Sequence, residues 1–228
     1  MEVKNYDMII KPQTPYKKLL TTYEEFEQTP KFGIQFVTGE AGSGKTSLVN
    51  LLLDEIAERN EDTLVVSGLC YIHSEYNIPY QPFKEILREL IQDVTREKQL
   101  SEAKNSRNNT IKKALSFTAK MICDHAPDLI GSFVPGASII KVLGEHVFSK
   151  KETKEISIDE TKILEQYIQA LKSISAKYQI IIFIDDLQWI DNLSVNLLYQ
   201  VIKGLKNHPV LFIGGFRSTD ILSSGQTH

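Results

Sequence analysis

The sequence has few cysteines, no long apolar run and little net charge. Its two cysteines, Cys70 and Cys123, lie far apart with no cysteine or histidine at metal-ligand spacing, which predicts buried thiols in a reducing compartment. The start of the chain carries no apolar signal core, and no apolar run approaches the roughly 18 residues that cross a membrane. A net charge of −3, from 26 basic and 29 acidic residues, gives no electrostatic case for nucleic-acid binding. We therefore predict a cytoplasmic protein with no membrane span.

The composition is that of an ordinary globular protein, with one informative glycine-rich stretch. The 228 residues, 42% hydrophobic and 24% charged, suffice for one α/β domain with an inserted helical segment. Residues 39–46 read Gly-Glu-Ala-Gly-Ser-Gly-Lys-Thr and fit the phosphate-binding loop pattern G-x-x-x-x-G-K-[ST] at each fixed position. The alternative interpretation is a glycine-rich turn that holds no ligand.

Each residue type in this stretch suits a polyphosphate. Glycines let backbone N–H groups approach phosphate oxygens, Lys45 brings a cation to the outer phosphates, and the Thr46 hydroxyl can ligate Mg²⁺. A strand predicted at 32–38 precedes the loop and apolar residues at helical spacing follow it, which is the context that the motif requires. The predicted nucleotide-binding residues are Gly39, Glu40, Ala41, Gly42, Ser43, Gly44, Lys45, Thr46 and Ser47.

An acid pair follows a second predicted strand. Residues 180–184 are an unbroken apolar run, typical of a strand buried on both faces of a parallel sheet, and Asp185 and Asp186 come directly after it. In phosphate-loop enzymes an acid at this place holds Mg²⁺, and we assign that role to Asp185. Asp186 is then placed to orient or deprotonate the attacking water. The alternative is a solvated turn that caps the next helix.

A third buried strand is predicted at 209–215, and Arg217 follows it. The chain has five arginines, at 59, 88, 96, 107 and 217, and only Arg217 lies beside a motif. A basic side chain at the end of such a strand can reach the γ-phosphate, so Arg217 is a candidate sensor and catalytic residue. The alternative is an ion pair between Arg217 and a nearby acid such as Asp220.

Strands and helices alternate along the rest of the chain, with a further strand at 63–68 and a mobile polar loop at 95–109. This alternation predicts an α/β fold, a parallel sheet with helices on both faces. Helices are predicted at 17–28, 83–94, 110–125, 157–174 and 191–205. The predicted divisions are an N-terminal extension at 1–31, a core at 32–220 with a helical insertion at about 95–157, and a tail at 221–228.

Three segments resemble the AAA-type signal-transduction ATPases, or STAND class, in the branch fused to bacterial transcription regulators, nucleotide cyclases and protein kinases. Residues 185–191, Asp-Asp-Leu-Gln-Trp-Ile-Asp, look like that family's second acidic motif. Residues 78–83, Ile-Pro-Tyr-Gln-Pro-Phe, resemble the segment after its second strand, and residues 213–217, Ile-Gly-Gly-Phe-Arg, resemble its sensor strand. The resemblance covers about residues 33 to 219.

The resemblance implies a P-loop NTPase sheet in the strand order 5-1-4-3-2, with the 210–215 strand between the phosphate-loop strand and the Asp185 strand. It assigns phosphate and Mg²⁺ to Lys45 and Thr46. The family's Gly-Arg-Glu segment for the adenine is missing upstream, so the residues that would read the base are not identified. The family's fifth strand, helical lid, winged-helix and sensor domains would follow His228. We therefore expect a fragment, or a partner that completes the sheet.

The function expected from these features is a Mg²⁺-dependent, ATP-binding switch module with slow hydrolysis, which bound ATP and ADP hold in different arrangements. Its partners would be ATP and protein domains. Two alternatives stay open. One is an AAA+ motor or loader acting on nucleic acid or protein, which would need an arginine from a neighbouring subunit. The other is a nucleotide-binding scaffold that does not hydrolyse.

Overall fold

Helices and strands alternate along the part of the chain that the computed structural model describes. The structure describes residues 13–60, 62–72, 78–100, 121, 122, 129, 133 and 160–217, with the backbone alone for residues 13 and 91–100. The elements in chain order are α1 (Gln13–Gln28), β1 (Gly33–Thr38), α2 (Lys45–Arg59), β2 (Thr63–Leu69), α3 (Gln81–Leu100), α7 (Glu160–Ser175), β3 (Gln179–Asp185), a 3₁₀ turn (Leu187–Trp189), α8 (Asn192–Gly204) and β4 (Val210–Phe216).

The described strands form one parallel sheet in the order β1-β4-β3-β2. In β4, Gly215 pairs with Val37 of β1 on one side, and Ile213 pairs with Phe183 of β3 on the other. This arrangement confirms the predicted α/β P-loop NTPase fold, with β4 between the phosphate-loop strand and the Asp185 strand. Because all four strands run the same way, the segments that follow β1, β3 and β4 meet at one edge of the sheet.

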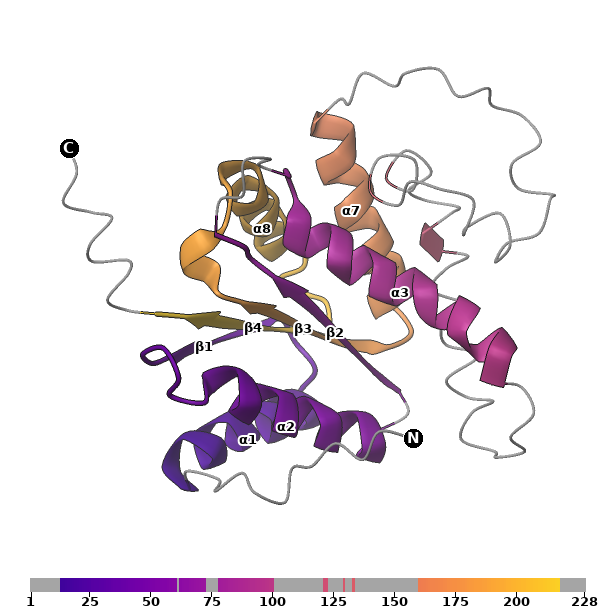
Figure 1. Ribbon diagram of the computed structural model, residues 1–228. Helices are drawn as coiled ribbons and strands as arrows, with labels where there is room; N and C mark the ends of the chain where they lie inside the picture. The colour runs from indigo at the N-terminus through magenta and orange to yellow at the C-terminus, as the bar shows by residue number, and fades with distance from the viewer. Residues whose placement is uncertain are drawn as a thin grey trace, which may run out of the picture.

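Helices cover both faces of the sheet (Figure 1), with α1 and α2 on one face and α3, α7 and α8 on the other. The central strands β3 and β4 are buried along nearly their whole length. Ile181 and Phe183 point to the α1–α2 face, whereas Ile180, Ile182 and Ile184 point to the other. Both faces of β3 are therefore shielded from water, which explains why its sequence is an unbroken apolar run.

Helix α1 belongs to this layered core, although the sequence predicts that residues 1–31 form a separate extension. Its apolar side chains recur every three or four residues, so they share one helical face. That face is buried against α2 and the sheet through Tyr16, Leu19, Tyr23 and Phe26. The Tyr16 hydroxyl also donates a hydrogen bond to Glu55 of α2 at 2.5 Å. Residues 1–12 lie outside the described residues.

The two edges of the described sheet differ. At the β2 edge, the Glu85 and Glu89 carboxylates of α3 accept hydrogen bonds from the backbone N–H groups of Leu69 (2.8 Å) and Ser67 (2.6 Å). These carboxylates satisfy donors that an edge strand would otherwise expose. At the β1 edge, Ile34 and Phe36 are 41% and 50% exposed.

Helix α3 also runs further than the sequence predicts. A polar loop was expected from residue 95, but the helix continues to Leu100. The residues at 96–99 are Arg, Glu, Lys and Gln, which all have high helix propensity, so this polar stretch continues the helix instead of forming a loop. The remaining loop and insertion at 101–157 and the tail at 221–228 lie almost wholly outside the described residues. None of the described helices has the length and apolar character needed to cross a membrane.

Candidate active site

The glycine-rich loop connects β1 to α2 at the carboxyl edge of the sheet. Gly42 and Gly44 have φ angles of 74° and 82°, a region that only glycine adopts without strain. These two residues turn the chain so that α2 begins at Lys45, and Gly44 is its N-cap. The N-terminal N–H groups of α2 and its positive dipole end therefore face the edge where β3 and β4 also end. The Lys45 ammonium donates to the Glu40 carbonyl oxygen at 3.3 Å, within the loop itself.

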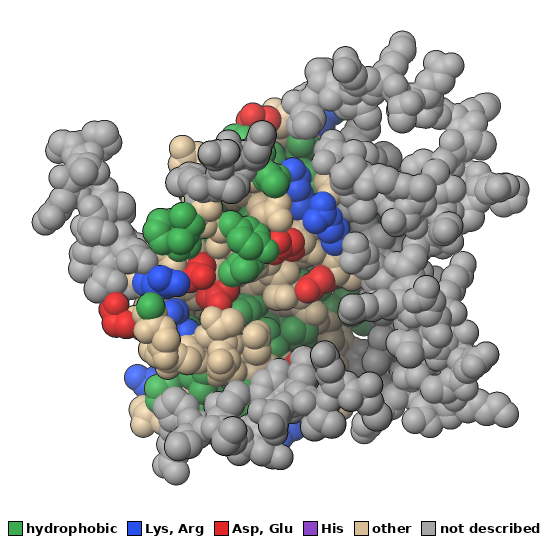
Figure 2. Space-filling model, in the orientation of Figure 1, with side chains coloured by type: hydrophobic (Ala, Val, Ile, Leu, Met, Phe, Trp, Pro, Cys, Tyr) green, Lys and Arg blue, Asp and Glu red, His purple; other side chains and the backbone are tan. Residues whose placement is uncertain are grey.

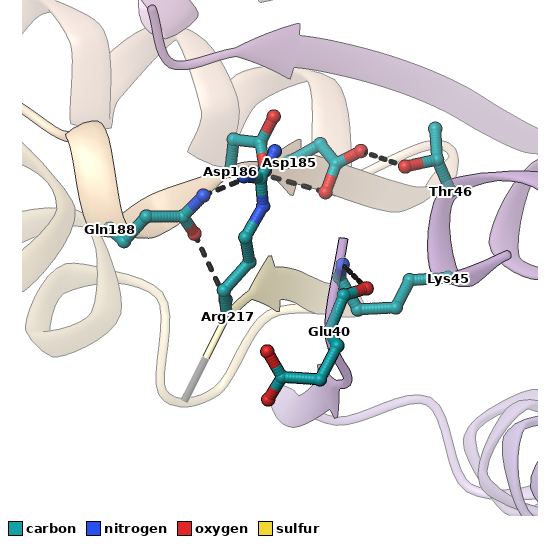
Figure 3. Close-up of polar contacts among 7 residues, drawn as sticks. All are labelled: Glu40, Lys45, Thr46, Asp185, Asp186, Gln188 and Arg217. Atoms are coloured by element: carbon teal, nitrogen blue, oxygen red, sulfur yellow. Dashed lines mark hydrogen bonds and ion pairs between the residues drawn. The ribbon is translucent and has the colours of Figure 1, made fainter. Parts of the chain in front are cut away.

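Asp185, the last residue of β3, contacts the first turn of α2. The Thr46 hydroxyl donates a hydrogen bond to Asp185 Oδ2 at 2.5 Å (Figure 3). The other carboxylate oxygen accepts the Asp186 backbone N–H at 2.8 Å. Asp185 is only 5% exposed, so these two donors replace water around a buried charge. Two segments 139 residues apart in the sequence thus meet at one carboxylate.

Two consecutive glycines in β4 leave room for neighbouring side chains, and Gly215 does so for this carboxylate. A Cβ atom added at Gly215 would overlap Asp185 Oδ1, and one added at Gly214 would overlap the Leu187 side chain. Glycine inside a buried strand weakens the strand unless something must approach closely. Asp185 makes that close approach at Gly215, so Gly215 is part of the site, whereas Gly214 makes room for Leu187.

Asp186 follows β3 in a left-handed backbone conformation, with φ 52° and ψ 44°. Its Oδ1 atom accepts a hydrogen bond from Gln188 Nε2 at 2.8 Å and lies 3.7 Å from Arg217 Nε. Figure 3 shows Arg217 extending from the end of β4 toward Asp186, with Gln188 beside both residues. Arg217 therefore pairs with Asp186; Asp220, the alternative partner, lies outside the described residues.

The surroundings of the acid pair are partly apolar and carry several negative charges. Figure 2 shows acidic and basic side chains close together at the left of the molecule, where the strands end.

Cys70, just after β2, is buried, and burial together with the nearby Asp191 and Asp186 carboxylates raises the pKa of its thiol to about 12. The thiol therefore stays protonated at neutral pH and supplies no nucleophile. The other cysteine, Cys123, lies outside the described residues.

A cavity of about 360 Å³ opens beside the Thr46–Asp185 contact, between α2, β2, β3 and α3. Glu85, Arg88 and Glu89 of α3 line its outer side. The cavity therefore extends the site from Thr46 and Asp185 away from the glycine-rich loop. It reaches these two residues from the β2 side of the sheet.

The residues present suit Mg²⁺, which takes most of its ligands from phosphates and waters, better than a metal ion whose ligands are all protein side chains. Among the described residues there is no group of three or more His, Cys, Asp or Glu side chains that could hold a metal ion. Mg²⁺ in nucleotide sites is held by one or two protein oxygens, with phosphates and waters completing its octahedron. The buried Asp185 carboxylate and the Thr46 hydroxyl meet that requirement. They would be the two protein ligands.

The structure brings together the residues that the sequence singled out from three separate segments. Residues 39–47 form the loop and the first turn of α2, and Asp185, Asp186 and Arg217 lie at the adjacent strand ends. Gln188 was missed, although a polar amide within the apolar Leu187 to Ile190 stretch was a signal. The Gly214–Gly215 pair was noted only as strand sequence; two glycines in a buried strand indicate a close approach.

The sequence model of the AAA ATPase domain family matches residues 15–213, which is most of the chain. The chain therefore belongs to this family, and membership indicates nucleotide binding and hydrolysis. The match begins within α1 and ends in β4, so it includes the loop and the acid pair. No curated protein matches the chain.

Proposed function

We propose that this chain is the Mg²⁺-dependent, ATP-binding and slowly hydrolysing switch module of a cytoplasmic signal-transduction ATPase. The observation that carries the proposal is the 2.5 Å contact between Thr46 and Asp185, which joins the phosphate-binding loop to the acid pair. The likeness of residues 78–83 and 185–191 to the STAND class supports the signal-transduction branch.

The loop and α2 would bind the triphosphate. Backbone N–H groups of residues 42–46 would contact phosphate oxygens, and the Lys45 ammonium would exchange its Glu40 carbonyl partner for the outer phosphates. Thr46 and Asp185 would hold Mg²⁺, which, when bound, neutralises charge that develops on the phosphates. Both residues already lie at one point, so little reorganisation precedes binding.

Asp186 would orient and deprotonate the attacking water. The water oxygen forms a bond to the γ-phosphorus, the proton passes to the Asp186 carboxylate, and the bond to the oxygen of ADP breaks. Asp191 is a poorer candidate for this role. Both of its carboxylate oxygens accept hydrogen bonds from Ser194, one from the backbone N–H at 2.9 Å and one from the hydroxyl, so it serves as the N-cap of α8.

Arg217 would distinguish ATP from ADP. In the structure its guanidinium faces Asp186 at 3.7 Å. A γ-phosphate would compete for this cation, whereas ADP has no γ-phosphate to do so. A switch of this kind works only through the difference in affinity between its two arrangements, and exchange of the Arg217 partner supplies such a difference.

The Asp186–Arg217 pair also favours a second candidate, a nucleotide-binding scaffold that does not hydrolyse. A carboxylate whose Oδ1 already faces Gln188 Nε2 and Arg217 Nε has less of its acceptor capacity left for a water. Phosphate release separates the two functions. The scaffold would bind ATP tightly and release no phosphate.

The test is a calorimetric titration of the protein with ATP, ADP and GTP, with Mg²⁺ and with EDTA, while released phosphate is followed in the same samples. Lys45→Ala should abolish nucleotide binding because the phosphates lose their main cation. Lys206→Ala, at an exposed lysine beyond α8, is the matched control and should bind as the wild type does. Equal affinity of wild type and Lys45→Ala would refute the site.

Asp186→Asn should keep Mg²⁺-ATP affinity and lose phosphate release, because the amide cannot accept the proton of the water. General-base contributions are typically about 10²- to 10⁴-fold, so the loss should be at least about 100-fold. Undiminished release in this variant would remove Asp186 from the role. Tight binding without any release by the wild type would favour the scaffold.

A further inference from the structure

We infer that Gln188 is a positioning residue that holds the Asp186 carboxylate and the end of β4 in one arrangement, so that the water-activating acid and Arg217 act as a unit. The inference rests on the proposed ATPase function. It concerns a side chain that the phosphate loop and the acid pair do not include.

A single amide group of Gln188 joins the ends of two strands. Its Nε2 donates to Asp186 Oδ1 at 2.8 Å, beyond the end of β3, and its Oε1 accepts the Arg217 backbone N–H at 3.1 Å, at the end of β4. Both ends of the amide are engaged, so the side chain has one preferred position. A displacement of either strand end would therefore be transmitted to the other through the Gln188 side chain.

The chemistry of the two partners determines which way the amide faces. A carboxylate only accepts hydrogen bonds, and a backbone N–H only donates. Rotating the Gln188 amide by half a turn would set oxygen against the Asp186 carboxylate and nitrogen against the Arg217 N–H. Both hydrogen bonds would then be lost, so the orientation in Figure 3 is the only satisfied one.

The backbone around Gln188 is held independently of its side chain. Gln188 lies in the 3₁₀ turn Leu187–Trp189, which is closed by hydrogen bonds from Trp189 N to Asp186 O (2.9 Å) and from Ile190 N to Leu187 O (3.2 Å). The amide therefore extends from a fixed base. Loss of the amide should leave the turn in place and remove only the hydrogen bonds to the Asp186 carboxylate and to the Arg217 backbone N–H.

Asp186 needs such support because its backbone is strained. Residues other than glycine rarely adopt these φ and ψ angles, and they keep them only where the surrounding structure holds them there. Both contacts of the carboxylate described above involve Oδ1, so we assign the contact with the attacking water to Oδ2. Without Gln188 the carboxylate would rotate against the Arg217 cation alone, at 3.7 Å, and a misplaced base loses rate.

The test compares kcat for phosphate release with the Kd for Mg²⁺-ATP in Gln188→Met, which keeps the length of the side chain but neither hydrogen bond. We expect kcat to fall roughly 10- to 100-fold, part of the contribution of a general base, while Kd changes by less than about threefold. Gln188→Ala is the second variant if the methionine variant does not unfold cooperatively. Loss of binding and rate together would overturn the inference.

Gln188→Glu separates the two ends of the amide. A carboxylate can still accept the Arg217 N–H, but it cannot donate to Asp186 and it repels that residue. If support of Asp186 is what matters, Gln188→Glu stays as slow as Gln188→Met or becomes slower. Recovery of the wild-type rate in Gln188→Glu would overturn the inference, because only the contact with β4 would then be needed.

Gln35→Met is the matched control for a purely structural role. Gln35 of β1 also uses both ends of its amide: it accepts from Thr22 Oγ1 of α1 at 3.1 Å and donates to the Phe36 carbonyl oxygen of its own strand at 2.9 Å. It touches neither acid of the site, so kcat should stay within about twofold of the wild type. An equal fall in kcat in Gln188→Met and Gln35→Met would contradict the inference. A wild type that releases no phosphate would instead refute the proposed hydrolytic function, and the inference would fall with it.

Discussion

Gly215→Ala should weaken the site from a position outside both the phosphate-binding loop and the acid pair. The added Cβ would overlap Asp185 Oδ1, the oxygen that accepts the Asp186 N–H. The carboxylate can escape only by rotating, which strains or breaks that hydrogen bond and the one from Thr46. Hydrogen bonds to charged groups contribute about 1.5–3 kcal/mol, and 1.4 kcal/mol is a factor of ten in affinity. We therefore expect Mg²⁺-ATP binding to weaken about ten- to hundredfold.

The same substitution should also lower the free energy of unfolding, but by less than the lost hydrogen bonds alone would. Replacing glycine by alanine reduces the entropy of the unfolded chain and stabilises a protein by about 0.4–1 kcal/mol where the backbone permits it. Set against the loss at Asp185, the free energy of unfolding should fall by roughly 0.5–2.5 kcal/mol. The Mg²⁺-ATP affinity should thus fall by more than the loss of folding stability alone would explain.

The assay is a titration of ATP with Mg²⁺ and with EDTA, together with urea unfolding of the same samples. Gly33→Ala in β1 is the matched control, because its added Cβ would lie 3.2 Å from Leu211 Cδ1, the end of a flexible side chain. That variant should bind as the wild type does. Wild-type Mg²⁺-ATP affinity in Gly215→Ala would refute the reasoning, since the carboxylate would then not depend on the space beside β4.

Two further predictions concern Arg217 and His208. Arg217→Ala should narrow the preference for ATP over ADP by roughly tenfold, the value of one charge-assisted contact to the γ-phosphate, and an unaltered ratio of the two Kd values would count against sensing. For His208, whose ring Nδ1 lies 2.9 Å from Ser175 Oγ, burial and the nearby Lys172 lower the pKa from 6.5. The fold therefore favours neutral imidazole, so its contribution to stability is present above about pH 6.5 and is lost as the pH falls through the folded pKa. Urea unfolding on both sides of pH 6.5 should show a smaller loss at acid pH in His208→Gln than in the wild type, and equal losses would contradict the assignment.

Local patterns in the sequence predicted most of the fold. The apolar run at 180–184 indicated a central strand because a strand buried on both faces needs no alternation, and that strand is β3. The phosphate-loop motif indicated a strand, a turn and a helix in that order, and β1, the glycine turn and α2 follow it. The position of β4 between β1 and β3 came from the family resemblance, because a periodicity within one strand says nothing about its neighbours.

Features that depend on close approach between distant segments were missed. Glu85 and Glu89 lie in the helix predicted at 83–94, but the sequence does not indicate that they satisfy backbone donors of β2. The sequence gives no reason for a glycine at position 215, whereas the structure shows that the Asp185 carboxylate lies against it. Both cases involve a side chain of one segment and the backbone of another, which spacing along the chain cannot reveal.

The sequence by itself determined which residues have the chemistry for a polyphosphate and a divalent cation, because residue type and spacing set those properties locally. Only the tertiary structure decided that Thr46 and Asp185 touch, that Gln188 joins the ends of β3 and β4, and that Arg217 faces Asp186. The physical reason is the crossover of the parallel sheet. It brings the ends of strands that are far apart in sequence to one edge, where a hydrogen bond depends on ångström distances rather than on sequence separation.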